Sequence, residues 1–237
     1  RPIVTGGSGL YVRALTREQR LLDPKVVYGY FPCASSGDDL IVYRPAGLED
    51  HVRVWTPGSV PSGARPGSTA LIEWVRFTFP RQGKGRFFCI SDFFASVDSG
   101  NLDVVAFHLV TMGAVASEHS QQLFQSGNYK EYLYFHGLGV ESAEALAELW
   151  HRRIRQELGI DRADDPETRK LFSQHYQGSR YSFGYPACPS LEDQAKLFEL
   201  LRPERIGVML TEQYQLVPEQ STSALIVHHP EARYFNI

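Results

Sequence analysis

Residues 206–229 read IGVMLTEQYQLVPEQSTSALIVHH. Apolar and polar side chains alternate on both sides of the short polar segment 219–222, EQST. An alternation with a period of two places successive side chains on opposite faces of an extended chain, which is typical of a half-buried strand. This stretch therefore predicts a β-hairpin with one buried face, turning at EQST.

The first part of the chain predicts two further strands. Residues 26–31 (VVYGYF) and 40–43 (LIVY) flank the segment 32–39 (PCASSGDD), whose serines, glycine and aspartates are typical of a turn. The segments 69–79, 85–94 and 103–113 are also apolar, but their periodicity is compatible with either a strand or a buried helix.

Two helices are predicted between these strands and the hairpin. Residues 141–158 place apolar side chains at helical spacing, and Gly159 follows where a C-cap glycine belongs. The apolar stripe consists of Leu146, Leu149, Trp150, Ile154 and Leu158. A second helix is predicted from Ser190, which can cap it, to a point before Pro203. Its buried face consists of Leu197, Phe198 and Leu201.

The order of strands, then helices, then a hairpin favours an α+β fold with a largely antiparallel sheet. A chain of 237 residues with 43% hydrophobic and 22% charged residues has an ordinary globular composition. The net charge is −3 and no basic run is present, which argues against nucleic acid as a partner. No apolar stretch approaches the roughly 18 residues that cross a bilayer, which argues against a membrane span.

The cysteines and the start of the chain indicate a cytoplasmic location. Cys33, Cys89 and Cys188 are far apart and odd in number, as expected in a reducing compartment. No pair has the C-x-x-C spacing of a metal site, and no signal peptide is recognisable. The sequence therefore predicts neither a disulfide framework nor a metal centre.

The segment 176–189, YQGSRYSFGYPACP, is the strongest candidate for a binding site. A following proline favours extended geometry at Tyr185 and Cys188, and an extended loop leaves backbone groups available to a ligand. Arg180 offers a planar fork for a carboxylate, and the aromatic rings offer faces for a heterocycle or a cation. These residues suit a zwitterionic ligand with an aromatic group. The alternative is a rigid connector with Arg180 in solvent.

Residues 180–189, RYSFGYPACP, resemble the R-x-x-x-G-Y-P-A-C-P signature of the activation domain of cobalamin-dependent methionine synthases. The segments 28–43, 145–160 and 206–237 resemble that family's strand–turn–strand, long helix, and closing hairpin with tail, in the same order. The resemblance extends over about residues 24–237.

This resemblance implies a C-shaped single α+β domain with a twisted, largely antiparallel sheet flanked by helices. Residues 1–20 are an atypical N-terminal segment, and 21–237 form the S-adenosylmethionine-binding activation domain. The implied function is to support the reductive remethylation of cob(II)alamin to methylcobalamin. The implied partners are a cobalamin-binding domain of the same polypeptide, which holds the cobalamin, and a flavodoxin-like electron donor. The chain itself is expected to be monomeric.

The resemblance also assigns roles to residues, all of them in ligand binding and none catalytic or metal-ligating. Arg180 matches the arginine that binds the ligand carboxylate, Tyr185 lies near the sulfonium, and Glu144 lies near the ammonium group. The other assigned residues are Gly184, Pro186 and Ala187 of the signature, and Tyr234 and Phe235, whose backbone lines the adenosine. Gln174 stands at a position that is often acidic in relatives, and the family's upstream aspartate segment is not recognisable here.

Several other interpretations compete with this one. A stand-alone S-adenosylmethionine-binding sensor or scaffold, without cobalamin chemistry, is the alternative function. Gly6, Gly7 and Gly9 form an incomplete dinucleotide-binding motif, because Val12 replaces its last glycine. Residues 1–15 resemble a short segment of tRNA dimethylallyltransferases, but the P-loop of that family is absent from the sequence. The single E-x-x-H formed by Glu148 and His151 is expected to lie on a solvated helix face, because a di-iron bundle needs two copies.

Overall fold

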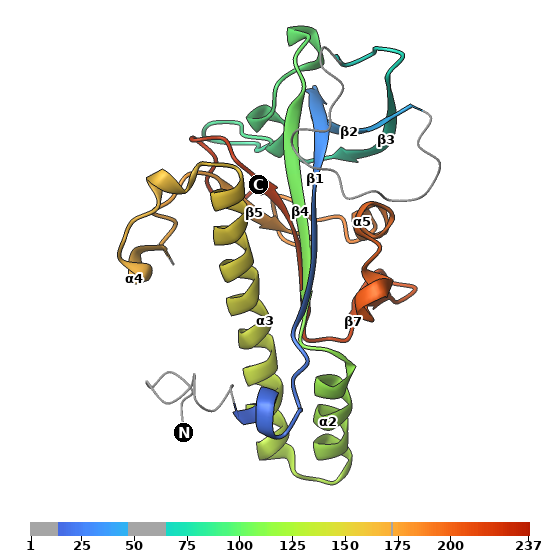
Figure 1. Cartoon of the computed structure of the whole chain (residues 1–237), viewed down its shortest axis with the longest axis vertical. Helices are drawn as coiled ribbons and strands as arrows, with labels where there is room; N and C mark the ends of the chain where they lie inside the picture. Colours follow the sequence, from blue (N-terminus) through green and yellow to red (C-terminus); the bar gives the residue numbers. More distant parts are fainter. Residues whose placement is uncertain (1–13, 47–64, 172) are drawn as a thin grey trace. The chain divides into compact units, whose positions relative to one another are not determined.

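The computed structural model describes residues 14–46, 65–171 and 173–237. Six strands form one sheet in the order β3-β2-β1-β4-β8-β5, and two short strands, β6 and β7, form a second sheet (Figure 1). The pairs β1–β2, β2–β3 and β5–β8 are antiparallel. The strands are β1 Lys25–Ser36, β2 Asp39–Pro45, β3 Leu71–Thr78, β4 Asp103–Thr111, β5 Ser179–Ser182, β6 Met209–Leu210, β7 Leu216–Val217 and β8 Ser221–Val227. The expected α+β fold with a largely antiparallel sheet is confirmed.

The helices vary widely in length. The α-helices are α2 Ala114–Gln125, α3 Tyr129–Glu157, α4 Thr168–Leu171 and α5 Asp193–Leu201. Short 3₁₀ or π turns are η1 Ala14–Glu18, η2 Ile90–Phe93, η3 Val97–Ser99, η4 Asp161–Ala163 and η5 Pro203–Ile206. Within the described ranges, none of the helices combines the length and apolarity that a bilayer crossing requires.

The chain divides into two compact units. Among the described residues, unit 1 comprises 14–27, 108–150 and 202–223, and unit 2 comprises 28–46, 65–107, 151–171, 173–201 and 224–237. Each unit buries its own apolar cluster, and this burial is the main force that holds each together. In unit 1 the cluster consists of Leu15, Leu22, Val110, Met112, Ala116, Phe135, Leu138, Ala143 and Ala147. In unit 2, rings in mutual contact include those of Phe31, Trp74, Phe77, Phe107 and Phe183.

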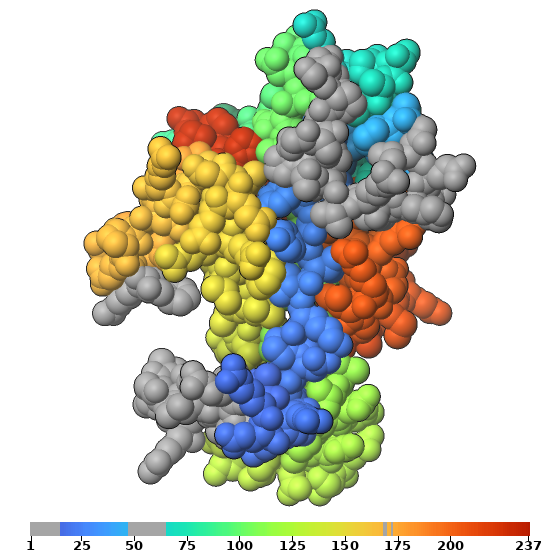
Figure 2. Space-filling view, viewed as in Figure 1, coloured from blue at the N-terminus to red at the C-terminus, as the bar shows by residue number. Residues whose placement is uncertain are grey.

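The link between α2 and α3 lies on the surface of unit 1, where it is coloured green in Figure 2. Phe124 and Tyr129, on either side of this link, are each 55% exposed. Their rings contact each other and Tyr132. The start of α3 therefore carries exposed aromatic side chains, whereas Phe135 and Leu138 on the same helix are buried in the core.

The turn between the first two strands is shorter than the sequence predicts. β1 continues to Ser36, and only Gly37 and Asp38 connect it to β2. Gly37 adopts φ +57°, a conformation that glycine reaches without strain. The buried Ser35 is compatible with a strand because its N–H bonds Ala95 O and its hydroxyl bonds Phe94 O. The polar composition of 32–36 was therefore a misleading turn signal.

The long helix begins earlier than predicted, and its buried stripe differs. α3 starts at Tyr129, and its N-terminal part is stabilised by packing in the core of unit 1. Leu149, expected on the buried stripe, is 59% exposed, whereas Ala143, Ala147 and Ile154 are buried. Gly159 has φ +72°, as expected for a residue that ends a helix. α5 begins at Asp193 rather than at Ser190, but Leu197, Phe198 and Leu201 are buried as predicted.

The predicted C-terminal hairpin is wrong in its pairing. β6 pairs with β7 inside the stretch expected to be one strand, and a hydrogen bond from Thr211 N to Gln215 O closes their turn. β8 instead pairs with β5 in the six-stranded sheet. The expected alternation is absent from β8, because the residues from Ser223 to Val227 are all buried; β8 is an interior strand rather than one arm of a surface hairpin.

Candidate ligand-binding site

β5 presents Arg180 at the candidate site. The strand pairs with β8, with Arg180 opposite Ile226. Ser179 and Tyr181 are buried, while Arg180 and Ser182 are half-buried. Because successive side chains of a strand point to opposite faces, Arg180 and Tyr181 lie on different faces of β5. The arginine is therefore on the more accessible face, as a ligand-binding role requires.

The signature segment after β5 forms a compact turn, in which Tyr185 and Cys188 pair as an isolated antiparallel β-bridge, as their predicted extended geometry allows. Gly184 N donates to Cys188 O, and Cys188 N donates to Tyr185 O, both at 2.8 Å. Pro186 occupies the second position of this turn, where its fixed φ is favourable. The prediction that the loop leaves its backbone groups unpaired is wrong for these four groups, because the turn itself pairs them.

The turn exposes one part of the signature and buries the other. Tyr185 is 56% exposed, and Gly184 and Pro186 are also exposed. Ala187 and Cys188 are each 1% exposed. Burial raises the pKa of the Cys188 thiol, so this cysteine stays protonated and packs in the interior. The accessible residues of the turn are thus Gly184, Tyr185 and Pro186.

The C-terminal tail is held against β5 by aromatic contacts. Phe235 is 7% exposed, and its ring contacts those of Tyr181, Phe88 and Phe93. Tyr234 is 39% exposed, with its ring stacked 6.5 Å from that of Tyr181. The two tail residues assigned to the ligand therefore differ: Tyr234 is accessible, whereas the Phe235 side chain is a buried anchor.

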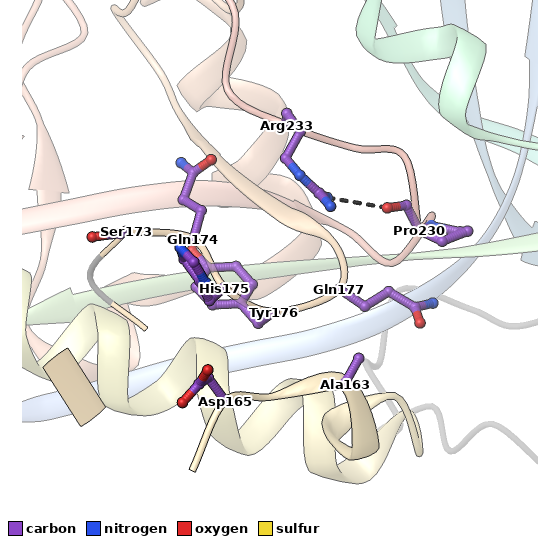
Figure 3. Close-up of a pocket in the computed structure, with 9 residues that line it drawn as sticks. All are labelled: Ala163, Asp165, Ser173, Gln174, His175, Tyr176, Gln177, Pro230 and Arg233. Carbon is purple, nitrogen blue, oxygen red and sulfur yellow. Dashed lines mark hydrogen bonds between the residues drawn. The ribbon is translucent and has the colours of Figure 1, made fainter. Parts of the chain in front are cut away.

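An open polar pocket lies in unit 2 beside the tail (Figure 3). Its volume is about 630 Å³. It is lined by Ala163, Asp165, Ser173, Gln174, His175, Tyr176, Gln177, Pro230 and Arg233. Gln174 links the pocket to the tail, because its Oε1 accepts a long, 3.5 Å hydrogen bond from Tyr234 N. Asp165 and Arg233 give the pocket one acidic and one basic side chain.

The assigned residues divide between the two units. Arg180, the turn 184–187 and the tail residues belong to unit 2, where Tyr181 connects β5 to the tail. Glu144 is half-buried on α3 in unit 1. The structure therefore ties β5 to the tail, and the turn follows β5 directly in the chain; the ligand-binding roles of all the assigned residues, Glu144 included, stay predictions.

His151 contradicts the expectation of a solvated E-x-x-H face. Its side chain is fully buried, and its ring meets the Tyr176 ring edge-on at 5.1 Å. Across the residues that the structure describes, no group of three or more His, Cys, Asp or Glu side chains is arranged to hold a metal ion.

Two features of the site were missed from the sequence. Tyr181 does not stand out among the three tyrosines of the signature segment, although strand alternation next to Arg180 could have indicated an inward-facing role. The contribution of Ala163, Asp165, Ser173 and His175 to the pocket was also missed, since this part of the sequence lacks periodicity. These residues are held by contacts of their segment with α3 and with the tail, which are distant in sequence.

The comparisons with known proteins agree with this architecture. A sequence profile of the family described as vitamin B12 dependent methionine synthase, activation domain, matches residues 11–237. Methionine synthase of Mycobacterium tuberculosis is 46% identical over 233 residues, covering 94% of this chain and 18% of that protein. Methionine synthase of Mycobacterium leprae is 47% identical over 222 residues, covering 90% and 17%. The chain thus spans less than a fifth of these relatives.

A solved structure shares the fold across the whole chain. It is described as the crystal structure of the MetH reactivation domain bound to AdoHcy. Its TM-score is 0.78 at 25% sequence identity, covering 100% of this chain and 69% of that one. The chain therefore belongs to the family of activation domains of vitamin B12-dependent methionine synthases.

Proposed function

We propose that this chain binds S-adenosylmethionine at the surface formed by Arg180, the turn 184–187 and the C-terminal tail. In doing so it supports the reductive remethylation of cob(II)alamin to methylcobalamin within a methionine synthase. The observation that carries the proposal is that β5, which holds a half-buried arginine, is tied to the C-terminal tail through Tyr181 and is followed directly by a closed turn with an exposed tyrosine. The AdoHcy bound to the similar reactivation domain supports a ligand of this class.

The side chains present suit the chemistry of this ligand. The guanidinium of Arg180 can bind a carboxylate with two charge-assisted hydrogen bonds. The exposed ring of Tyr185 offers a π face to a sulfonium cation. The backbone of Gly184, Pro186 and Ala187, and that of Tyr234 and Phe235, would line the rest of the ligand. Glu144 is proposed for the ammonium end.

The chain's contribution to the reaction is binding and orientation. When bound, S-adenosylmethionine supplies an electrophilic methyl group on its sulfonium. Transfer of that group needs alignment of donor and acceptor, and it requires no general acid or base. Accordingly no catalytic residue is assigned, and the protonated, buried Cys188 has no nucleophilic role.

The proposal requires a partner that presents the methyl acceptor from outside. Cobalamin would be held by another domain of the same polypeptide, and the exposure of Tyr185 leaves the turn open to its approach. We further propose a flavodoxin-like protein as the electron donor, a monomeric chain, and a cytoplasmic location.

Two measurements test this function. Titration calorimetry of the 237-residue chain should detect S-adenosylmethionine binding and, separately, S-adenosylhomocysteine binding. Incubation with a separately produced cobalamin domain and a reductant should yield methylcobalamin, whereas the chain alone should transfer no methyl group. Binding without transfer to the cobalamin domain would favour the sensor or scaffold alternative. Failure to bind the ligand would refute the proposal.

A further inference from the structure

Arg155 is a buried cation with an uncommon set of partners, all within unit 2. It lies near the C-terminal end of α3 and is 1% exposed. Its Nε and Nη2 bind the two carboxylate oxygens of Asp164 at 2.9 and 2.7 Å. Its guanidinium carbon also lies 4.0 Å from the centre of the Tyr176 ring. One side chain therefore contacts residues that are twelve positions apart in the sequence.

The two partners of Arg155 flank a closed loop. Asp165 N donates a 3.0 Å hydrogen bond to His175 O, which joins the ends of the segment 165–175. We call the hydrogen-bonded pair Asp165 and His175 the neck of the loop. Asp164 immediately precedes the neck, and Tyr176 immediately follows it. Arg155 thus holds the chain on both sides of the neck; the segment 151–167 is coloured yellow to light orange in Figure 2.

The chain beyond the neck leads directly into the ligand site. Gln177 Nε2 donates to His228 O at 2.9 Å, and Gly178 adopts φ +88° against the carbonyl of Val227. Three residues separate Tyr176 from Arg180 on β5. On the other side of the neck, Gln174 lines the pocket and contacts the tail at Tyr234. The position of Tyr176 therefore affects both Arg180 and the pocket wall.

Stability alone is a weak reason for such a pair. Removing two charges from water is costly, and replacing a buried ion pair by apolar side chains of similar size is often neutral or stabilising. What the bidentate pair and the ring contact add is a defined geometry. We propose that Arg155 is a positioning residue for S-adenosylmethionine binding, which clamps the neck of the loop 165–175 and so fixes the pocket wall and Arg180. This inference rests on the proposed function.

The test separates positioning from stability. The double variant Arg155→Met/Asp164→Leu replaces the ion pair by apolar side chains. We expect its thermal unfolding midpoint to be close to that of the parent, but its Kd for S-adenosylmethionine to rise at least about tenfold. We also expect faster amide hydrogen exchange at residues 173–179 with no ligand present. Arg155→Lys keeps the positive charge but lacks the planar guanidinium that makes two hydrogen bonds to Asp164. Its affinity for S-adenosylmethionine should therefore lie between those of the double variant and the parent.

The control is Arg153→Met, which removes an arginine that binds Glu157 on the exposed face of the same helix. This variant should leave the Kd for S-adenosylmethionine and the amide hydrogen exchange at residues 173–179 unchanged. A double variant with parental affinity and parental exchange would overturn the inference. If the double variant does not fold, Arg155→Lys decides: weaker binding at an unchanged unfolding midpoint supports positioning, and unchanged binding overturns it. If the parent chain binds no ligand, the proposed function fails, while the exchange measurement still decides whether Arg155 clamps the loop.

Discussion

The hydroxyl of Tyr181 donates a 2.7 Å hydrogen bond to the backbone carbonyl of Arg233. Tyr181 is 1% exposed, and this burial raises the pKa of its hydroxyl, which therefore remains a donor at neutral pH. The bond connects residues 52 positions apart and ties the tail to the strand that carries Arg180. One buried hydroxyl thus joins two of the elements assigned to the ligand.

Replacing Tyr181 by phenylalanine should loosen the tail without creating a large cavity. We expect Tyr181→Phe to lower the free energy of unfolding by about 1–2 kcal/mol, because the Arg233 carbonyl loses its partner. The affinity for S-adenosylmethionine should fall as well. Chemical denaturation and calorimetry measure the two effects. Tyr28→Phe removes a hydroxyl with an exposed hydrogen bond to Glu157 and serves as the control. An equal effect of both substitutions would contradict the tail-anchoring role.

Arg180 is expected to contribute the largest single share of ligand affinity. Arg180→Ala should weaken S-adenosylmethionine binding by roughly 2–4 kcal/mol, because the carboxylate loses a charge-assisted pair. Arg180→Lys should recover only part of the loss, since a lysine lacks the planar fork. The exposed Lys84 provides a matched control, as Lys84→Ala removes a cation from a different segment. Calorimetry that gives Arg180→Ala the parental affinity would place this residue outside the site.

The fold class was predicted correctly from the sequence, whereas the candidate site that the sequence indicated stays a prediction. The largely antiparallel sheet was inferred from the order of strands, helices and hairpin, although the pairing of the hairpin was wrong. Arg180 stood out by residue type, and Tyr185 by the resemblance of its segment to a family signature. α2 was missed because only Ala116 and Ser120 on it are buried, which leaves almost no apolar stripe. β3 and β4 stayed ambiguous between strand and helix, and in β4 the reason is an almost continuous run of buried residues. Tyr181 and Arg155 act through contacts distant in sequence, which local patterns do not encode.

Two glycines should respond oppositely to the same substitution. A Cβ on Gly178 would collide with the Val227 carbonyl, and its φ of +88° disfavours any L side chain. Gly178→Ala should therefore destabilise the fold by roughly 1–3 kcal/mol or more. Gly137 lies within α3, and a methyl group added there would meet no atom of another segment within 4 Å. Gly137→Ala should therefore stabilise the fold by roughly 0.5–1 kcal/mol. The thermal unfolding midpoints of both variants test these expectations. A Gly178→Ala variant more stable than the parent would disprove the close approach of Gly178 to the Val227 carbonyl.

The contact between Asp103 and His228 predicts that the protein loses stability in acid. Their 2.7 Å contact joins the start of β4 to the residue after β8. Burial alone would raise the pKa of Asp103, but hydrogen bonds from His228 and Ala95 N lower it below its ordinary value. The stabilisation is therefore present above the unfolded-state pKa, about 3.9, and is lost as the pH falls through the lower folded-state value. Asp103→Asn should lower stability at pH 7 and flatten this acid dependence. Parallel stability–pH curves for parent and variant would refute the assignment.

The N-terminal segment is expected to be dispensable for binding. Residues 1–13 lie outside the described part of the chain, and the family profile begins at residue 11. Leu15 is buried in the core of unit 1, so a clean deletion stops before it. A variant that lacks residues 1–10 should bind S-adenosylmethionine with unchanged affinity, as measured by calorimetry. A marked loss would show that this segment contributes to the site.

The two hydrogen bonds that close the turn 184–188 bear on the thermodynamics of ligand capture. A segment that is already folded loses little conformational freedom when a ligand arrives, so most of its ordering entropy has been lost during folding. The rigid ring of Pro186 restricts the unfolded chain as well, which further reduces the cost of forming the turn. Association at this surface is therefore expected to be rapid, with a heat capacity change set by the ligand's own buried area and not by coupled ordering of the loop.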